Sequence, residues 1–366
     1  MFDYLIVGSG LSGAVFAREA TARGRRCLVI EKRKQVGGNV RCENREGINV
    51  HLYGAHIFHA NSREVWDYVN RLTPFNHFVN SPIACFRGRL FNLPFNMNTF
   101  YQLWGCITPD EAREKIARQI QEANIPGEPR NLEEQALALC GKDIYLHLIK
   151  GYTEKQWGRD ATALPPEIIR RVPLRYTFDN NYFNDPYQGI PVGGYNRLVE
   201  ALLQGVEVKT GVDFFDDLPY FQGVADKILY TGRLDDFFHR SLGALEYRSL
   251  HFEHEFLPRP DFQGNAVVNY TAREVPYTRI IEHKHFEFGN QPHTVITREF
   301  PDEYSQDREP YYPVNDARNE KLRADYQQLA KACEKVIFRG RLAEYKYHDM
   351  DDAVASILQL VKTEFP

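Results

Sequence analysis

Three features that would place a protein in a specialised class are missing from this chain of 366 residues. Its six cysteines are scattered and form no CxxC pair, so the sequence indicates neither a zinc site nor a disulfide framework. It has no long apolar run, and its first residues carry neither a basic segment nor a cleavage site for secretion. The formal net charge of −4 gives no general attraction to nucleic acid or membranes. We therefore expect a cytoplasmic protein with no nucleic-acid partner and no stable membrane insertion.

Motifs for metal-assisted and nucleophilic hydrolysis are missing too. There is no HExxH motif, no carboxylate cluster at metal-ligand spacing and no GxSxG, so we expect no metal and no catalytic triad. The chain does have the length for two or three structural units, and it is rich in aromatics, with 21 Tyr and 24 Phe. Strand packing explains most of these rings. Several tyrosines, however, fall in loops rich in Gly and Pro, where packing is a weaker explanation.

The N-terminal segment has the pattern of a strand, a glycine-rich turn and a helix. Residues 3–7 (DYLIV) are a short, branched apolar run, which is typical of a buried parallel strand. The turn that follows reads Gly8, Ser9, Gly10, Leu11, Ser12 and Gly13. Gly8 allows the tight bend, Gly10 lets a diphosphate approach the backbone, and Gly13 lets the helix pack closely on the strand. The start of the helix then offers free N–H groups to phosphate oxygens.

A second strand, residues 27–30, ends in Glu31, whose carboxylate can accept hydrogen bonds from ribose hydroxyls. This fingerprint alone does not separate NAD from FAD. Three later features favour FAD: a second glycine pair that ends at Gly38, a strand at residues 227–232 that ends in Thr-Gly, and a C-terminal strand with Gly-Arg that leads to an acid-started helix. Their order along the chain predicts bound FAD.

We expect an α/β fold with α+β insertions: a Rossmann-like, two-dinucleotide-binding FAD fold that carries an inserted helical domain and an antiparallel β-sheet substrate domain. A capping box at residues 108–111 begins the helices, and the last of them is expected to stop at Gly151. Alternation over residues 249–256 and a hairpin at residues 86–91 indicate the sheet. The predicted boundaries are residues 1–75, 190–235 and 312–366 for the FAD-binding domain, 98–175 for the helical domain with a mobile lid loop, and 76–97, 176–189 and 236–311 for the sheet domain.

Four long motifs carry a resemblance to a known family. They are residues 54–59 (GAHIFH), 151–159 (GYTEKQWGR), 276–286 (PYTRIIEHKHF) and 341–350 (RLAEYKYHDM). In this order they resemble the bacterial UDP-galactopyranose mutases, and the resemblance runs from Gly8 to Met350. It implies an intramolecular transferase that interconverts UDP-galactopyranose and UDP-galactofuranose by ring contraction. Such an enzyme supplies galactofuranose for cell-surface polysaccharide, for example in lipopolysaccharide O-antigen biosynthesis.

The resemblance also implies the chemistry. Members of this family need reduced FAD, although the reaction has no net redox change. N5 of the reduced flavin attacks the anomeric carbon and displaces UDP, and the covalent adduct opens through an iminium before the 4-hydroxyl closes the smaller ring. The implied substrate is UDP-galactose in its pyranose and furanose forms, with NADPH or NADH as the reductant. Bacterial relatives suggest a homodimer.

The residues implied as catalytic are Arg171, Arg279 and His56. Two arginines suit a departing diphosphate because the guanidinium is planar, permanently charged and able to bind two oxygens at once. Arg170 and Arg175 are near enough in sequence to leave the first assignment open, and a solvated charge at a helix end would explain Arg171 without any function. His56 matches a histidine beside the flavin, whereas a lone loop histidine is more often a surface residue.

The other implied residues bind substrate or cofactor. The substrate group is Tyr152, Trp157, Tyr182, Asn269, Tyr312 and Tyr347. Trp157 lies between Gly151 and Gly158, which predicts a hinged lid, while Tyr311 is expected to pack away from the site because strand neighbours face opposite ways. The cofactor group is Gly8, Ser9, Gly10, Leu11, Ser12, Gly13, Glu31, Lys32, Gly38, Asn39, His59, Val212, Arg341, Asp349 and Met350. Whether His59, His283 and His285 face the site is left open, and one or two of them are expected to be structural.

Three alternatives stay open at this stage. An FAD oxidoreductase of the amine-oxidase or desaturase type shares the flavin fold, but paired arginines and tyrosines do not fit an apolar amine pocket. An inactive relative would bind UDP without turnover. A near relative that acts on another UDP-sugar also fits the sequence.

Overall fold

The computed structural model describes residues 1–169, 173–305 and 308–366. Its first sheet is parallel, with strand order β16-β10-β1-β2-β9. The strands are β1 (Phe2–Val7), β2 (Cys27–Glu31), β9 (Glu207–Thr210), β10 (Ala225–Tyr230) and β16 (Val336–Phe338). Leu5 and Ile6 of β1 are fully buried, as the apolar run predicts. Strands β9 and β10 both fall in residues 190–235, the segment predicted to belong with the first strands, and both pair within this sheet.

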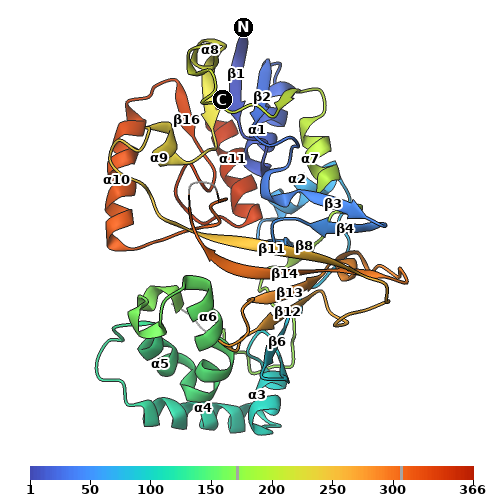
Figure 1. Ribbon diagram of the computed structural model, residues 1–366, viewed down its shortest axis with the longest axis vertical. Helices are drawn as coiled ribbons and strands as arrows, with labels where there is room; N and C mark the ends of the chain where they lie inside the picture. The colour runs from blue at the N-terminus through green and yellow to red at the C-terminus, as the bar shows by residue number, and fades with distance from the viewer. Residues whose placement is uncertain (170–172, 306–307) are drawn as a thin grey trace.

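Helices cover this parallel sheet on its faces (Figure 1). They are α1 (Leu11–Ala22), α2 (Arg63–Leu72), α7 (Tyr195–Leu203), α8 (Leu218–Gly223), α9 (Leu234–Phe237) and α11 (Met350–Glu364). Helix α10 (Ala317–Lys331) packs on a separate apolar cluster, where its Tyr326 is buried with Leu234 and Tyr247. Helix α1 packs through small residues such as Ala14 and Ala17, which are completely buried, so it can lie close to the strands. The C-terminal helix α11 packs against α1 and closes the same core.

The second sheet has seven strands in the order β15-β11-β14-β13-β12-β6-β7. They are β6 (Ile83–Phe86), β7 (Arg89–Asn92), β11 (Tyr247–Leu257), β12 (Val267–Tyr270), β13 (Arg279–Glu282), β14 (Thr294–Glu303) and β15 (Tyr312–Pro313). The predicted hairpin turn is present, with positive φ at both Arg87 and Gly88. The expectation of a fully antiparallel sheet is wrong in one place. Strand β6 runs parallel to β12, because the two strands come from distant segments that no hairpin joins.

Short strands and turns connect the two sheets. They are β3 (Cys42–Arg45) with β4 (Ile48–His51), β5 (Phe58–Ala60) with β8 (Tyr187–Gly189), and the 3-10 turns Gly38–Val40 and His283–Glu287. Strand β15 begins at residue 312, the residue predicted to open the last FAD-binding segment, but it pairs with β11 of the seven-stranded sheet. We propose that the folded chain keeps the three-domain division predicted from the sequence.

The helical part lies at the other side of the seven-stranded sheet and has its own apolar core (Figure 1). It contains α3 (Met97–Trp104), α4 (Pro109–Ala123), α5 (Leu132–Ile144), a π-helix (Tyr145–Ile149), α6 (Lys150–Trp157) and the 3-10 turns Ala161–Ala163 and Pro166–Ile169. The capping box of Thr108 and Glu111 starts α4 as predicted. Among the described residues, no helix is both long enough and apolar enough to cross a bilayer.

The structure corrects the prediction that Gly151 stops a helix. Helix α6 runs through Gly151 to Trp157 and ends at Gly158, which has φ +66°. Gly151 serves close packing instead, because a Cβ there would lie 2.4 Å from the carbonyl oxygen of Thr271. The segment between the two glycines is therefore a helix held against the sheet, so the prediction of a loop is wrong for these residues, and a mobile lid stays a prediction.

Candidate active site

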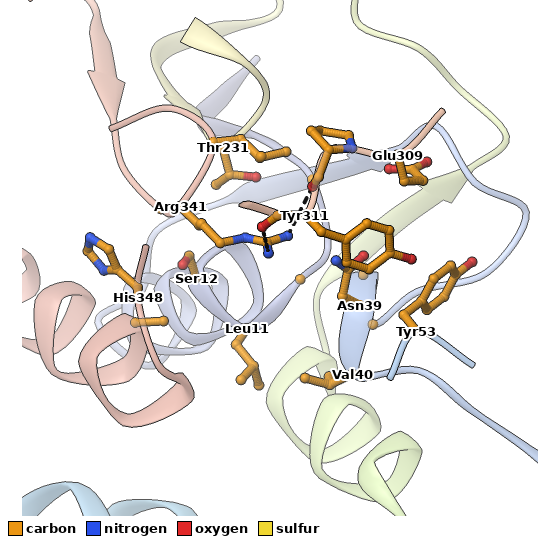
Figure 2. Close-up of a pocket in the computed structure, with 18 of the residues that line it drawn as sticks. Leu11, Ser12, Asn39, Val40, Tyr53, Thr231, Glu309, Tyr311, Arg341 and His348 are labelled. Carbon is orange, nitrogen blue, oxygen red and sulfur yellow. Dashed lines mark hydrogen bonds between the residues drawn. The ribbon is translucent and has the colours of Figure 1, made fainter. Parts of the chain in front are cut away.

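A single cavity of about 620 Å³ joins the first turn of the parallel sheet to the seven-stranded sheet. Its wall includes the glycine turn after β1, the loop that carries His56, and Arg279 of β13. Figure 2 shows the part around Arg341, where Leu11 and Ser12 at the start of α1 lie with Asn39, Tyr53 and Tyr311. The volume is in the range of cofactor sites, and the lining combines one dinucleotide turn with several tyrosines.

The glycine turn forms a cradle for a diphosphate. Gly8 has φ +101°, and a Cβ on Gly13 would lie 2.0 Å from the carbonyl oxygen of Gly8. Gly10 is the N-cap of α1 and offers no capping side chain, so the first N–H groups of the helix stay available to a ligand. Gly38 has φ +54°, and a Cβ there would lie 2.9 Å from the Cα of Gly10. These close approaches are the reason for four glycines at one site.

Glu31 at the end of β2 is already engaged within the protein. One carboxylate oxygen accepts hydrogen bonds from the amide (3.0 Å) and the hydroxyl (2.7 Å) of Ser9, and the other accepts from the amide of Arg33 (3.0 Å). Ser9 is fully buried, and Glu31 itself lines the cavity. Lys32, Gly38, Asn39 and Val212 line the cavity. A ribose contact for Glu31 stays a prediction.

Arg33 is a residue that the sequence analysis missed. Its guanidinium lies 4.4 Å from the ring centre of Tyr53, donates to Asn39 at 3.0 Å and pairs with Glu309 at 2.9 Å. It therefore connects three loops that line the cavity, those that carry Asn39, Tyr53 and Glu309. The basic run at residues 32–34 was the available signal, but it does not show which of the three residues points inward.

Arg341 lies fully within the cavity wall. Its guanidinium donates to the carbonyl oxygens of Tyr311 (2.5 Å) and Pro310 (3.4 Å), the contacts drawn in Figure 2. Burial lowers the pKa of Arg341 below its ordinary value. The predicted residues Asp349 and Met350 begin α11 and line the same wall. The Asp349 carboxylate makes no capping bond, and burial raises its pKa, so the expectation that it caps this helix through its side chain is wrong.

His56 is the first of three connected histidines. Its Nδ1 lies 2.8 Å from the carbonyl oxygen of Gly54, so Nδ1 carries the proton and Nε2 is left as an acceptor. The His56 amide donates to Nδ1 of His51 (3.2 Å), and the His51 amide donates to Nδ1 of His283 (3.2 Å). Burial lowers the pKa of His56 to about 4 and that of His51 to about 3. All three rings are therefore neutral near pH 7. His283 does not contact His56 directly but holds the backbone of His51, which in turn holds that of His56.

Arg279 occupies the centre of the substrate side. It is paired across the sheet with Asn269 on β12 and Glu299 on β14. Its Nη2 donates to the hydroxyl of Tyr152 at 2.5 Å, and its Nε lies 3.1 Å from a carboxylate oxygen of Glu299. Burial by itself lowers the pKa of Arg279, but Glu299, Tyr152 and Tyr312 outweigh this and raise it well above its ordinary value. The guanidinium is thus a buried, permanently charged donor.

The predicted tyrosines gather around Arg279. Tyr312 and Tyr347 stack at 5.9 Å between ring centres, and both line the cavity together with Tyr182. Tyr311 is 5% exposed and packs edge-on against Phe252, as expected for a packing residue, yet it also contributes to the cavity wall. Asn269 keeps its Oδ1 buried without a hydrogen-bond partner in the described part of the chain. Asn269 is not among the residues that line the cavity, so its contact with substrate stays a prediction.

His59 and Arg175 hold the loop that carries Tyr182. His59 stacks on Phe183 at 3.8 Å between ring centres, and its Nδ1 lies 2.5 Å from Asp185. Arg175 donates to the carbonyl oxygens of Asn181 and Tyr182. The guanidinium of Arg175 is therefore engaged with its own loop, which makes it a poor alternative to Arg171 as a diphosphate ligand.

Some predicted residues lie away from the cavity or outside the described chain. Trp157 packs against the apolar core of the helical part, so the structure does not bring it to the cavity. Arg171 and Arg170 lie outside the described residues. Their proposed roles stay predictions.

One group of possible metal ligands lies elsewhere. Asp261, Glu282 and His285 bring one ligand atom each within 4.8 Å. The Glu282 carboxylate accepts hydrogen bonds from the amides of residues 262, 263 and 264, and the ammonium of Lys284 lies 3.6 Å from Asp261. These contacts explain the cluster without a metal, because they fix the turn at residues 261–264 to residues 282–285. The expectation of no metal stays a prediction.

The comparisons with known proteins agree with this geometry. Residues 147–347 match the sequence model of the UDP-galactopyranose mutase family, and residues 6–72 match that of the NAD(P)-binding Rossmann-like domain. A probable UDP-galactopyranose mutase of Klebsiella pneumoniae is 37% identical over 98% of this chain and 93% of its own. A dTDP-fucopyranose mutase of Escherichia coli is 35% identical over 98% of this chain and 97% of its own.

A solved structure supports the fold. The crystal structure of a reduced UDP-galactopyranose mutase superposes with a TM-score of 0.74, at 14% identity, over 100% of this chain and 94% of that one. The Rossmann-like fold predicted from the sequence is thereby confirmed. From the match of the family model and of relatives over nearly the whole chain, this protein belongs to the UDP-galactopyranose mutase family of isomerases.

Proposed function

We propose that this protein interconverts UDP-galactopyranose and UDP-galactofuranose with reduced FAD as its cofactor. The observation that carries the proposal is one continuous cavity, which is lined at one end by the glycine cradle and at the other by the charged Arg279. A dinucleotide in the cradle and a sugar diphosphate at Arg279 would meet inside it. The family of the chain supports the same reaction.

The residues present fit FAD. The cradle of Gly8, Gly10 and Gly13 would hold its diphosphate, since backbone N–H groups and the positive end of α1 favour phosphate. Arg341, His56 and Met350 line the wall that would face the flavin. When bound and reduced, the flavin supplies a nucleophilic nitrogen, N5, for the anomeric carbon of the sugar.

The chain itself supplies position and charge. Arg279 is held in place by Tyr152 and Glu299 before substrate arrives, so it can stabilise the charge that grows on the departing diphosphate without reorganising. We propose Arg171 as the second diphosphate ligand. Tyr182, Tyr312 and Tyr347 offer hydroxyl donors and ring faces to the sugar nucleotide. The neutral His56 can accept a proton or hydrogen bond at Nε2 beside the reacting atoms.

A turnover assay tests the reaction. Dithionite-reduced protein should convert UDP-galactofuranose to UDP-galactopyranose with no net consumption of NAD(P)H. A borohydride-type reductant added to the working enzyme should leave a hexose bonded to the flavin, which mass spectrometry detects. Turnover without any modified flavin would contradict the proposed chemistry, and no turnover of either isomer would overturn the function.

The same ring contraction on dTDP-fucopyranose is a second candidate. The relatives with the two activities differ by only two points of identity, 37% and 35%. Adding the dTDP-fucose isomers to the same assay separates them, because the preferred substrate has the higher kcat/KM. Oxygen consumption with an amine substrate would instead support an oxidase.

Replacement of Gly13 by alanine should release the cofactor. The new methyl group would lie 2.0 Å from the oxygen of Gly8, so the turn must shift away from the diphosphate. Overpacking costs about 1–3 kcal/mol, which corresponds to an FAD affinity about 10- to 100-fold weaker. Flavin absorbance after gel filtration measures this. Gly223→Ala is the matched control, because no atom lies within 4 Å of a Cβ there; equal flavin content in both variants would contradict the cradle.

For the cellular setting we propose a cytoplasmic homodimer that is reduced by NADPH or NADH. Its galactofuranose would enter cell-surface polysaccharide, such as the O-antigen of lipopolysaccharide.

A further inference from the structure

Lys155 is a buried cation that the mechanism above does not use. It lies on α6, one turn after Gly151 and three residues after Tyr152. Its ammonium donates three hydrogen bonds to backbone carbonyl oxygens: those of Tyr270 (2.7 Å), Val275 (3.0 Å) and Tyr277 (2.8 Å). An ammonium group has three N–H donors, so all of them are satisfied by this one segment.

The three acceptors belong to the connection between β12 and β13. Tyr270 is the last residue of β12 and follows Asn269, and Tyr277 lies two residues before Arg279 at the start of β13. Lys155 therefore holds both ends of the connection, next to Arg279 and the predicted substrate residue Asn269. Because no side chain other than a cation with three donors could satisfy three carbonyls from one atom, the residue type is matched to this place.

Two further contacts bring α6 close to the same connection. A Cβ on Gly151 would lie 2.4 Å from the oxygen of Thr271 and 2.8 Å from the nitrogen of Arg273, so the helix backbone touches the connection directly. Glu154, which is 5% exposed, lies 3.3 Å from the guanidinium of Arg273. Gly151, Glu154 and Lys155 share one face of the helix at spacings of three and four residues. Tyr152 reaches from this docked helix to Arg279.

We propose that Lys155 is a positioning residue, which fixes helix α6 on the β12–β13 connection so that the Tyr152 hydroxyl and the Arg279 guanidinium meet where the sugar diphosphate binds. This inference rests on the proposed function. Lys155 touches no reacting atom, and it acts through the Tyr152–Arg279 contact. Burial lowers the pKa of Lys155 to about 8, so at neutral pH it remains a charged donor.

A double-mutant cycle in the full-length holoenzyme tests the inference. Lys155→Met keeps the length of the side chain and removes all three donors. A misplacement of about 1 Å can cost about 10²-fold in rate, so we expect kcat to fall by about 10- to 100-fold with unchanged flavin content. In a Tyr152→Phe background the same change should cost less than about threefold, because residues that act through one contact are not additive.

Lys150→Met is the matched control on the same helix. Lys150 pairs with Glu133 at 3.2 Å and lies 3.9 Å from Glu154. In the described part of the chain, none of its hydrogen bonds or ion pairs reaches the β12–β13 connection itself, so this variant should keep the wild-type kcat. Equal losses of rate in the wild-type and Tyr152→Phe backgrounds would overturn the proposal, since Lys155 would then serve stability alone. If Lys155→Met does not fold, Lys155→Arg enters the same cycle, because a planar guanidinium cannot direct three donors from one atom.

The affinity for UDP gives a readout that does not depend on turnover. UDP binding to the oxidised holoenzyme is measured for the same four proteins of the cycle. A weaker affinity in Lys155→Met that disappears in the Tyr152→Phe background supports the proposal, and additive effects overturn it. If the wild type binds UDP but isomerises no sugar, the proposed function fails, while this cycle still decides the role of Lys155.

Discussion

Arg279→Ala should lower kcat by about 10²–10³-fold, the usual loss when a preplaced donor to developing charge is removed, while the protein stays yellow. The reason is the position of this guanidinium. It lies on β13, the central strand of the seven-stranded sheet, where it donates a hydrogen bond to Tyr152 and pairs with the carboxylate of Glu299. It does not belong to the glycine cradle. Initial rates with UDP-galactofuranose and the flavin content per chain measure the two parts of the prediction. Arg171→Ala should act in the same way.

Removal of Arg279 leaves the Glu299 carboxylate buried without its cation, and that alone can destabilise the protein. The double variant Arg279→Ala/Glu299→Gln separates the two effects, because it restores neutrality but not the donor. Arg298 is the matched control. It lies beside Glu299 on β14, pairs with Glu255 at 2.7 Å and faces the other side, so Arg298→Ala should keep its rate. Loss of flavin in Arg279→Ala, or a wild-type rate, would show that the residue has been misplaced.

The features that the sequence predicts well are those set by neighbouring residues. The turn from Gly8 to Gly13 requires glycine for local steric reasons, and the Thr108 capping box and the Arg87–Gly88 turn are also complete within a few residues. Each is therefore visible in the sequence without knowledge of the fold. The parallel pairing of β1 with β2 follows from the same local pattern, because two strands joined by a helix lie parallel and are connected with a right-handed crossover.

The features that the sequence does not reveal depend on pairing between distant segments. Glu299 meets Arg279 only through the register of β13 and β14, and Lys155 finds its three carbonyls only because α6 docks on the next sheet. The two glycines around Trp157 look like hinges in the sequence. In the structure one of them is a contact point with Thr271, which no local pattern reports. Arg171 matches the family motif, and its assignment still rests on that resemblance.

Acid should destabilise this protein steeply between pH 6.5 and about pH 3. His51 and His283 are each 1% exposed, and burial lowers the pKa of His51 to about 3 and that of His283 well below its ordinary value. In the unfolded chain both regain a pKa near 6.5, so below that pH the unfolded state binds more protons and gains stability relative to the folded state. His51 should then cost about 2 kcal/mol of unfolding free energy at pH 5, and His283 adds to this loss.

The hydrogen bonds of His51 and His283 add to the loss of unfolding free energy in acid. The Nδ1 atoms of His51 and His283 each accept a backbone N–H, so protonation at either one would break a bond as well as bury a charge. Urea midpoints at pH 7 and pH 5 measure the loss. In His51→Asn, whose Oδ1 can still accept the His56 amide, the loss should shrink by about 2 kcal/mol, the share of one histidine. The exposed His251 is the control, and His251→Asn should leave the loss unchanged. If both variants followed the wild type, the neutral histidine chain behind the flavin side of the cavity would not be the acid-sensitive element.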